Sequence, residues 1–277
     1  MKKMHTLLAI AAALVASATT SVQATPEEDL KAMQEFYTGK FKDTKLADYG
    51  NGAFIFSADA YEQWKAMEEF PVYEDEVNKG EKIWSTPFKN GKTFADCLGE
   101  VSTVRAKYPM YDEAKDTVLT LEGEINACLK THGEEPFKSK KGELAQLSAY
   151  IALQARGQKV DVKIPNDKAL AWYERGKQHF YTKRGQLNLS CADCHVANAG
   201  NRIRAELLSP VVGQAIHFPL YRVKWGELGT LHRRYEGCNE QVRARPFKSE
   251  SDEFKALEYF HTYMSNGLDW IGPTYRK

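Results

Sequence analysis

Two cysteines and a histidine in the second half of the chain carry the clearest chemical signal in the sequence. Cys191 and Cys194 are spaced C-x-x-C, and His195 follows directly. This spacing is typical of c-type haem attachment, in which both thiols add across the haem vinyl groups and the imidazole becomes an axial iron ligand. The alternative is a redox-active C-x-x-C or half of a zinc site, but no second ligand pair at regular spacing is visible. The motif therefore predicts covalently bound haem c.

The start of the chain has the features of a secretory signal. After two lysines, residues 7–16 form an unbroken apolar run that is too short to span a bilayer, and residues 22–24 resemble a small-residue cleavage site. We therefore expect residues 1–24 to be a signal peptide and the mature chain to begin at Thr25, with no membrane span. Export combined with c-type haem predicts the bacterial periplasm, where thiols can oxidise.

The mature chain carries a formal charge close to zero. The full sequence has 38 Lys and Arg against 37 Asp and Glu, and two of the lysines lie in the signal peptide. Global charge therefore predicts neither nucleic acid nor a membrane surface as a partner. The basic residues that follow the haem motif form either a solvated surface or a site that attracts an anion to the haem. They are Arg202, Arg204, Arg222, Lys224, Arg233, Arg234, Arg243, Arg245 and Lys248.

Helical signals dominate the rest of the chain, so the predicted fold class is mainly α. A capping box at residues 25–28, with Pro26 at the first helical position, predicts one helix start, and Ser57 is a candidate cap for the next helix. Residues 160–164 look like a linker rather than a sheet strand. The expected helices lie at about 25–37, 57–70, 121–128, 144–157, 169–181 and 254–265.

An internal repeat divides the chain into two similar halves. Residues 79–84 and 175–180 each combine a basic residue, a glycine and an amphipathic start, and residues 94–98 align with the haem motif at 191–195. We therefore expect two cytochrome-c-like domains.

The first copy of the motif has lost its haem chemistry. Phe94 stands where a thioether cysteine would be, and Leu98 replaces the iron ligand. The expected division is a haem-free domain at 25–160 and a haem-binding domain at 161–277, which gives one haem c per chain.

The five cysteines of an exported protein can be sorted by use. With Cys191 and Cys194 committed to haem, one pair and one leftover thiol remain. Cys97 and Cys128 lie in the same half and are the expected disulfide, which would contribute about 3 kcal/mol to stability in the chain-entropy picture. Cys238 is then the unpaired thiol, and it is either buried and inert or functional.

The iron needs a second axial ligand or an open site. The candidates after the haem motif are His217, His232, Cys238, His261 and Met264. Met264 lies on the apolar final helix, where a core role is favoured, and the three histidines have no context that marks a ligand. Cys238 follows two arginines and Gly237, and positive charge favours the thiolate that an iron ligand or a sulfur nucleophile requires.

These residues, taken together, resemble a known family. The chain closely resembles the SoxA family, the catalytic cytochrome subunits of SoxAX complexes in thiosulfate oxidation. The segments that carry the resemblance are 181–188, 198–200, 225–228, 234–238, 241–244 and 263–267.

The resemblance implies roles for several residues. Haem c would be held by the motif cysteines, with His195 and Cys238 as the two axial ligands of the iron. Arg234, four residues before the ligand cysteine, matches the family's substrate-binding arginine. Members without an N-terminal haem carry a disulfide there, which suits Cys97 and Cys128.

The resemblance also implies an activity and partners. A SoxA protein pairs with a smaller cytochrome, SoxX, and acts as an L-cysteine S-thiosulfotransferase. It joins thiosulfate to a cysteine of the carrier protein SoxYZ and passes two electrons to cytochrome c. Two other interpretations remain open from the residues: a periplasmic electron-transfer cytochrome without covalent sulfur chemistry, and a non-catalytic subunit whose haem only assists assembly.

Overall fold

The computed structural model describes residues 24–138 and 140–276, so almost all of the expected signal peptide lies outside the described residues. The helices are α1 (Pro26–Lys40), α2 (Ala58–Glu69), α3 (Glu74–Ser85), α4 (Phe94–Leu98), α5 (Val101–Val104), α6 (Leu121–Thr131), α7 (Glu143–Gln154), α8 (Asp167–Tyr181), α9 (Leu231–Gln241) and α10 (Asp252–Tyr263). Short 3₁₀ or π-helical segments are η1 (Leu46–Phe56), η2 (Arg105–Lys107), η3 (Asp193–Ala197) and η4 (Ala215–His217).

The strands are few and short, which confirms the mainly α prediction. They are β1 (Met110–Asp112), β2 (Thr117–Leu119), β3 (Arg202–Ile203), β4 (Glu206–Leu207), β5 (Leu220–Arg222), β6 (Glu227–Gly229) and β7 (Thr274–Arg276). β1 pairs with β2 and β3 with β4, while a third sheet has the order β6-β5-β7, with β7 parallel to β5. No helix in the described part of the chain is both long and apolar enough to cross a membrane.

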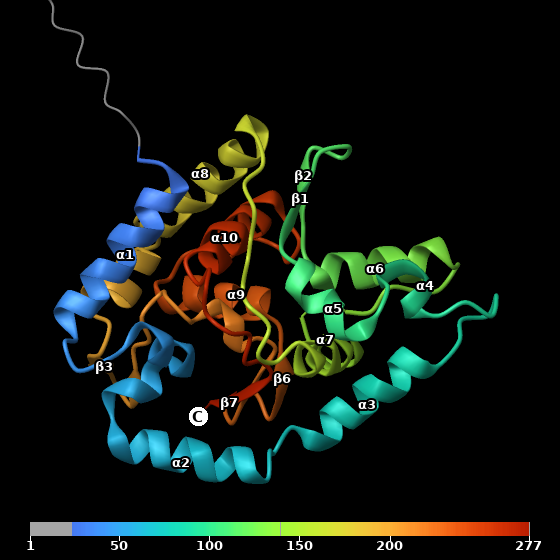
Figure 1. Ribbon diagram of the computed structural model, residues 1–277, viewed down its shortest axis with the longest axis horizontal. Helices are drawn as coiled ribbons and strands as arrows, with labels where there is room; N and C mark the ends of the chain where they lie inside the picture. Colours follow the sequence, from blue (N-terminus) through green and yellow to red (C-terminus); the bar gives the residue numbers. More distant parts are fainter. Residues whose placement is uncertain (1–23, 139, 277) are drawn as a thin grey trace, which may run out of the picture.

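Each half of the chain is built on a pair of helices that cross at a glycine. In the first half a Cβ on Gly80 of α3 would lie 2.1 Å from the carbonyl oxygen of Gln146 on α7. In the second half a Cβ on Gly176 of α8 would lie 2.0 Å from the carbonyl oxygen of Ala256 on α10. Only glycine permits such an approach, so the two glycines that mark the sequence repeat are points of close approach within each helix pair. Figure 1 shows the arrangement of these helices.

The repeat continues beyond these helix pairs. In the first half the β1–β2 hairpin leads into α6, and in the second half the β5–β6 hairpin leads into α9. Thr120 caps α6 and Thr230 caps α9, each through its side-chain oxygen. The same succession of elements therefore occurs twice, as expected for two cytochrome-c-like domains.

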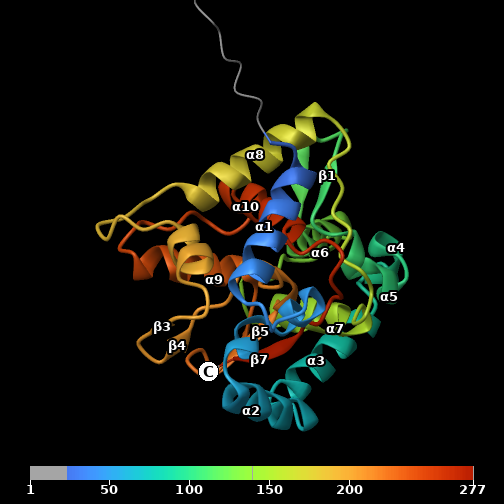
Figure 2. The same ribbon diagram turned by 60° about the vertical axis from the view of Figure 1, so that its left-hand side comes forward.

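The N-terminal segment lies within the expected first domain, 25–160, but it packs against the second half. Met33 and Tyr37 of α1 and Tyr49 of η1 belong to the core of the second half. The hydroxyl of Tyr173 on α8 donates to Asp29 of α1 at 2.9 Å, and both ribbon views show α1 running beside α8 (Figures 1 and 2). The expected first domain, 25–160, thus contains a segment whose core contacts are with the haem-motif half.

Candidate functional site

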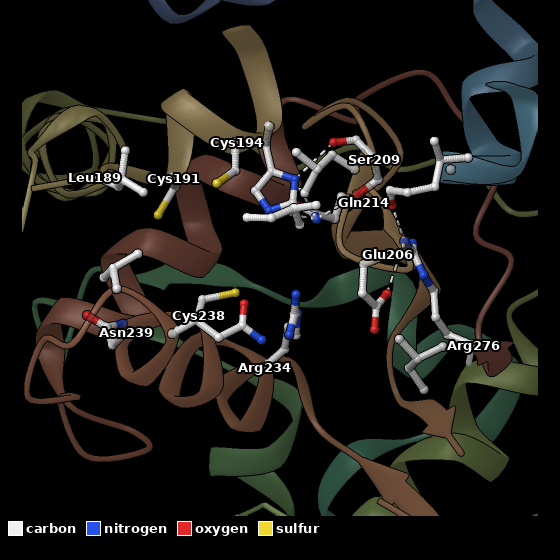
Figure 3. Close-up of a pocket in the computed structure, with 18 of the residues that line it drawn as sticks. Leu189, Cys191, Cys194, Glu206, Ser209, Gln214, Arg234, Cys238, Asn239 and Arg276 are labelled. Carbon is white, nitrogen blue, oxygen red and sulfur yellow. Dashed lines mark hydrogen bonds and ion pairs between the residues drawn. The ribbon is translucent and has the colours of Figure 1, made fainter. Parts of the chain in front are cut away.

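A cavity in the second half brings the predicted site residues together. It encloses about 1140 Å³ of space, part of it open to solvent. Figure 3 shows Cys191, Cys194 and Ser209 on one side of it and Cys238 and Arg234 on the other. The first side is formed by the turn that leads into η3, and the second by α9.

A local capping interaction shapes the turn that carries the haem motif. The backbone N–H of Ser190 donates to Asp193 at 2.8 Å, and the backbone N–H of Asp193 donates to the Ser190 hydroxyl oxygen at 3.1 Å. Thr93 and Asp96 make the same reciprocal arrangement at the start of α4. The Ala-Asp dipeptide shared by the two motif copies therefore has a structural role, since its aspartate closes the turn in both halves.

His195 is held in the form that can bind iron. Its Nδ1 lies 2.9 Å from the carbonyl oxygen of Ser209, which can only accept, so Nδ1 carries the proton and Nε2 keeps its lone pair. Burial lowers the pKa of this imidazole to about 4, so the side chain is neutral at physiological pH. A carbonyl on the second ring nitrogen is the usual way proteins orient a metal-binding histidine.

Helix α1 braces the loop behind His195. The Tyr37 hydroxyl donates to the backbone carbonyl of His195 and accepts from the backbone N–H of Val211 at 3.1 Å. Lys40 donates to the carbonyl of Ala197 at 3.0 Å. Sequence reasoning missed Tyr37, because nothing local to residue 37 indicates a contact with a loop so far along the chain.

Cys238 is an unpaired cysteine that lines the cavity from α9, one helical turn after Arg234. Cys191 and Cys194 are also free thiols. Burial, with the nearby charge of Cys238, raises the pKa of Cys191 to about 12 and also raises the pKa of Cys194. The two motif cysteines are therefore neutral thiols in this environment.

Among the described residues, four arginines and one glutamate line the same cavity. The backbone N–H of Arg234 donates to the carbonyl of Thr230, but its guanidinium forms no hydrogen bond or ion pair with a described residue. Arg222 donates to Glu206, and Arg276 donates to the carbonyl of Leu207 and lies 3.8 Å from Glu206. Sequence reasoning included Arg222 and Arg234 among basic residues but missed Arg276, which is distant from the haem motif in sequence, and Glu206, which no local motif marks.

The other candidates for the second iron ligand differ in whether they line a pocket or are buried elsewhere. Met264 is fully buried in the core, and His232 is held between Glu250 and Glu258, 3.2 Å from each. His217 lines the cavity and His261 lines a smaller pocket that shares residues with it, and each has a buried and unpartnered Nε2.

The residues present at this cavity fit haem c. Two thiols at haem spacing and a neutral imidazole, whose Nε2 keeps its lone pair and lies 3.3 Å from the side-chain amide of Gln214, face a third thiol across the cavity. Buried nitrogen atoms without partners, such as Nε2 of His217 and His261, are rare in a closed core and typical of a wall that faces a bound group.

The corresponding region of the first half is closed by a disulfide. Cys97 of α4 and Cys128 of α6 are bonded, with their Cα atoms 5.9 Å apart, as the sequence led us to expect. Phe94 and Leu98 are buried in the core beside it. Apolar side chains and a disulfide thus fill the position that the second half keeps open.

The two cysteines of this disulfide are the positional counterparts of two sulfur atoms in the haem-motif half. Cys97 aligns with Cys194 in the motif, and Cys128 lies as many residues after the cap of α6 as Cys238 lies after the cap of α9. A sequence signal for the second match exists and was missed. A threonine–leucine pair, a cysteine and a Pro-Phe-Lys run recur at equal spacing in 120–138 and 230–248.

Comparison with known proteins agrees with this arrangement. The SoxA/TsdA cytochrome c domain family matches residues 79–160 and again residues 175–269. The chain is 49% identical over 262 residues to the L-cysteine S-thiosulfotransferase subunit SoxA of Chlorobaculum tepidum, covering 95% of this chain and 92% of that protein. It is 47% identical over 256 residues to the protein of the same name from Allochromatium vinosum, with coverages of 92% and 91%.

A solved structure also resembles the chain. The crystal structure of SoxXA from P. pantotrophus aligns with a TM-score of 0.71 and 35% identity, covering 78% of this chain and 84% of that chain.

Proposed function

The chain belongs to the SoxA family, and on that premise we propose how its site joins thiosulfate to a cysteine of a carrier protein. In this reaction a cysteine thiol and the thiosulfate dianion lose two electrons and one proton. A sulfur–sulfur bond forms, and the carrier cysteine becomes an S-thiosulfonate. The observation that carries the proposal is an unpaired cysteine and an unpaired arginine one turn apart on α9, both lining the cavity of the haem motif.

Arg234 binds the sulfonate end of thiosulfate. A guanidinium with no protein partner can donate paired hydrogen bonds to a doubly charged oxyanion, and charge-assisted bonds of this kind are the strong ones. With the sulfonate held at Arg234, the terminal sulfur of thiosulfate faces Cys238, the next cavity-lining residue along the helix.

Cys238 carries the sulfur between substrate and product. The Cys238 thiol and thiosulfate lose two electrons and one proton, and Cys238 becomes the S-thiosulfonate. The carrier's cysteine thiolate then attacks the sulfur next to Cys238, forming the carrier S-thiosulfonate and releasing the Cys238 thiolate. This second step is an ordinary thiol–disulfide exchange and needs no further oxidant.

One haem c would be held covalently by Cys191 and Cys194, and His195 and Cys238 would ligate its iron. When bound it supplies one-electron transfer, so that two electrons leave in single steps for a cytochrome c. The chain's own contribution is a neutral His195 oriented by Ser209 and a turn closed by Asp193.

We propose that the first half binds no haem. Phe94 and Leu98 cannot supply a thioether or an iron ligand, and Cys97 is engaged with Cys128. Haem staining of the two halves after proteolysis should mark only the fragment with residues 191–195. Stain in the fragment that contains the disulfide would overturn the single-haem assignment.

The proposal extends to the partners and the location. A smaller SoxX cytochrome is the expected partner, since the solved relative is a SoxXA complex. SoxYZ is the carrier whose cysteine accepts thiosulfate, and cytochrome c is the electron acceptor. A periplasmic location is consistent with the N-terminal sequence and with the disulfide.

The competing function is electron transfer without covalent sulfur chemistry, and one experiment separates the two. Holoprotein in complex with its partner is mixed with thiosulfate and oxidised cytochrome c but no carrier, and the peptide containing Cys238 is weighed after acid quenching. Our proposal predicts an added thiosulfonate on Cys238. Reduction of cytochrome c by thiosulfate with an unmodified Cys238 would favour the electron carrier.

A further inference from the structure

We propose that Arg276, presented by the last strand of the chain, and Arg222 beside it hold the two propionates of haem c. Arg234 is thereby left as the guanidinium available to thiosulfate. The proposal rests on the haem c of the proposed function and is independent of its sulfur chemistry.

The two arginines form a pair because of strand register. β7 lies parallel to β5, and Arg222 is the Cα partner of Arg276. Neighbouring register partners place their side chains on the same face of a sheet, and both residues line the cavity. Two guanidinium groups held side by side match two carboxylates that leave one edge of a cofactor.

The surroundings fix both guanidinium groups in place. Arg222 has only 5% of its side chain exposed and packs over the ring of Trp225, and Arg276 has 22% exposed and packs over the ring of Phe54. Stacking on an aromatic ring keeps the planar group oriented.

The excess of positive charge around Arg222 and Arg276 favours binding of an anion there. Glu206 is the acidic residue among the described cavity-lining side chains, and it contacts both Arg222 and Arg276. Burial lowers the pKa of Arg276 to about 10, partly offset by Glu206, while the positive charges of Arg234 and Arg222 lower it further. Guanidinium groups that repel one another in a buried site are stabilised when further carboxylates join them.

Position along the cavity separates the roles of the arginines. The propionates and the thioether-forming vinyl positions lie on opposite edges of the haem ring. Figure 3 shows Cys191 and Cys194 toward one end of the cavity and Arg276 with Glu206 at the other. Arg234 lies between these ends, beside Cys238, where its charge acts on Cys194 and His195.

A fourth cavity-lining arginine belongs to the thioether end. Arg184 donates to the carbonyl of His179 at 3.4 Å, and it lies near Cys191 in the same cavity. It is therefore on the wrong side of the cavity to meet a propionate.

Resonance Raman spectra of the holoprotein test the assignment, because the propionate bending bands respond to hydrogen bonds on those carboxylates. Arg276→Gln and Arg222→Gln are expected to shift these bands, whereas Arg234→Gln leaves them as in the wild type. Arg245→Gln is the matched control, since Arg245 is an exposed arginine of the same half.

The reduction potential gives a second readout. Loss of a positive charge at a propionate favours the oxidised haem. Arg276→Gln should therefore shift the ferric–ferrous equilibrium about tenfold toward the ferric form, which lowers the reduction potential by about 59 mV for one electron. Glu206→Gln removes a negative charge from the same cluster and should raise the potential.

Unchanged propionate bands in both Arg276→Gln and Arg222→Gln would overturn the proposal, and a band shift in Arg234→Gln would overturn the division of roles.

If Arg276→Gln does not yield holoprotein, the variant Arg276→Lys provides the test. Lysine keeps the charge but loses the paired donors, so the bands shift if Arg276 bonds a propionate and stay unchanged if it does not. None of these measurements involves thiosulfate. They therefore test propionate binding even if the proposed transfer mechanism is wrong.

Discussion

Arg234 and its neighbour Arg233 show how two adjacent arginines on one helix take different roles. Arg233 lies 3.1 Å from Glu227 and packs over Trp225, whereas Arg234 lines the cavity without a described ion-pair partner. An ion-paired arginine stabilises the fold, and an unpaired arginine in a cavity is available to an anion. At the residue scale, we therefore propose Arg234 rather than Arg233 as the substrate-binding arginine.

Arg234→Gln is expected to raise the KM for thiosulfate about 10- to 100-fold, the equivalent of a charge-assisted hydrogen bond worth about 1.5–3 kcal/mol. The haem absorption spectrum should stay as in the wild type. Arg234→Lys should recover only part of the loss, because it keeps the charge but not the planar pair of donors. Steady-state kinetics with Arg233→Gln as the control check this, and an equal rise of KM in both variants would contradict the assignment.

At the scale of elements, α1 works as a brace for the haem-motif loop. Tyr37 of α1 bonds the backbone on both sides of that loop, at His195 and at Val211. Tyr49 is as deeply buried as Tyr37, but its hydroxyl has no hydrogen-bond partner. These two tyrosines provide a matched pair for measuring what the brace contributes.

Tyr37→Phe is expected to lower the free energy of unfolding of the holoprotein by about 1–3 kcal/mol, because a buried backbone carbonyl and N–H lose their partner. Tyr49→Phe should change it little or increase it, since that hydroxyl is buried unbonded. Urea unfolding followed by circular dichroism measures both variants. Equal stability of Tyr37→Phe and the wild type would show that α1 does not brace the loop.

The elements differ in how far the sequence predicts them. The starts of α1 and α2 were predicted because their caps are local: Thr25 with Glu28, and Ser57. Helix α9, which carries Cys238, was not expected. Its buried residues include His232 and Asn239, and Gly237 lies within it, so the apolar periodicity that marks a helix is weak. Positions that face a cofactor or a charged network need not be apolar, which is why site helices are harder to read than core helices.

The site itself was partly predictable for a related reason. The haem motif, the unpaired cysteine and the neighbouring arginine are local patterns, and the structure places Cys191, Cys194, His195, Cys238 and Arg234 around one cavity. Arg276 and Glu206 come from β7 and β4, short strands whose meeting depends on tertiary packing alone. Long-range pairing of this kind has no signature in a single sequence.

At the scale of the whole molecule, charged groups are buried where the two halves meet. Glu122 of α6 is 8% exposed, and the hydroxyl of Ser148 on α7 donates to it at 2.7 Å. Burial raises the pKa of this carboxyl, the charge of Glu258 on α10 raises it further, and Arg105 opposes the rise. Because Glu258 belongs to the second half, the repulsion between these two carboxyl groups acts between the halves.

Glu122→Gln is expected to stabilise the protein at neutral pH by about 1 kcal/mol or more. A carboxyl whose pKa is raised on folding stabilises fully below its unfolded value, near 4.5, and this stability is lost as the pH rises through the folded value. Glutamine keeps the acceptor for Ser148 without the charge. Urea unfolding at pH 4 and pH 7.5 should show a gain only at the higher pH. A loss of stability at pH 7.5 would mean that the ionised Glu122 is well paired.

The central claim is that Cys238 carries the sulfur during turnover, and Cys238→Met tests it most directly. Holoprotein with its SoxX partner, thiosulfate, the carrier and cytochrome c is assayed by the intact mass of the carrier. The variant should fold and load haem, because a thioether is also an iron ligand, and it should still accept electrons from dithionite. The account predicts that its carrier gains no thiosulfonate. A carrier modified at the wild-type rate would contradict the covalent role of Cys238.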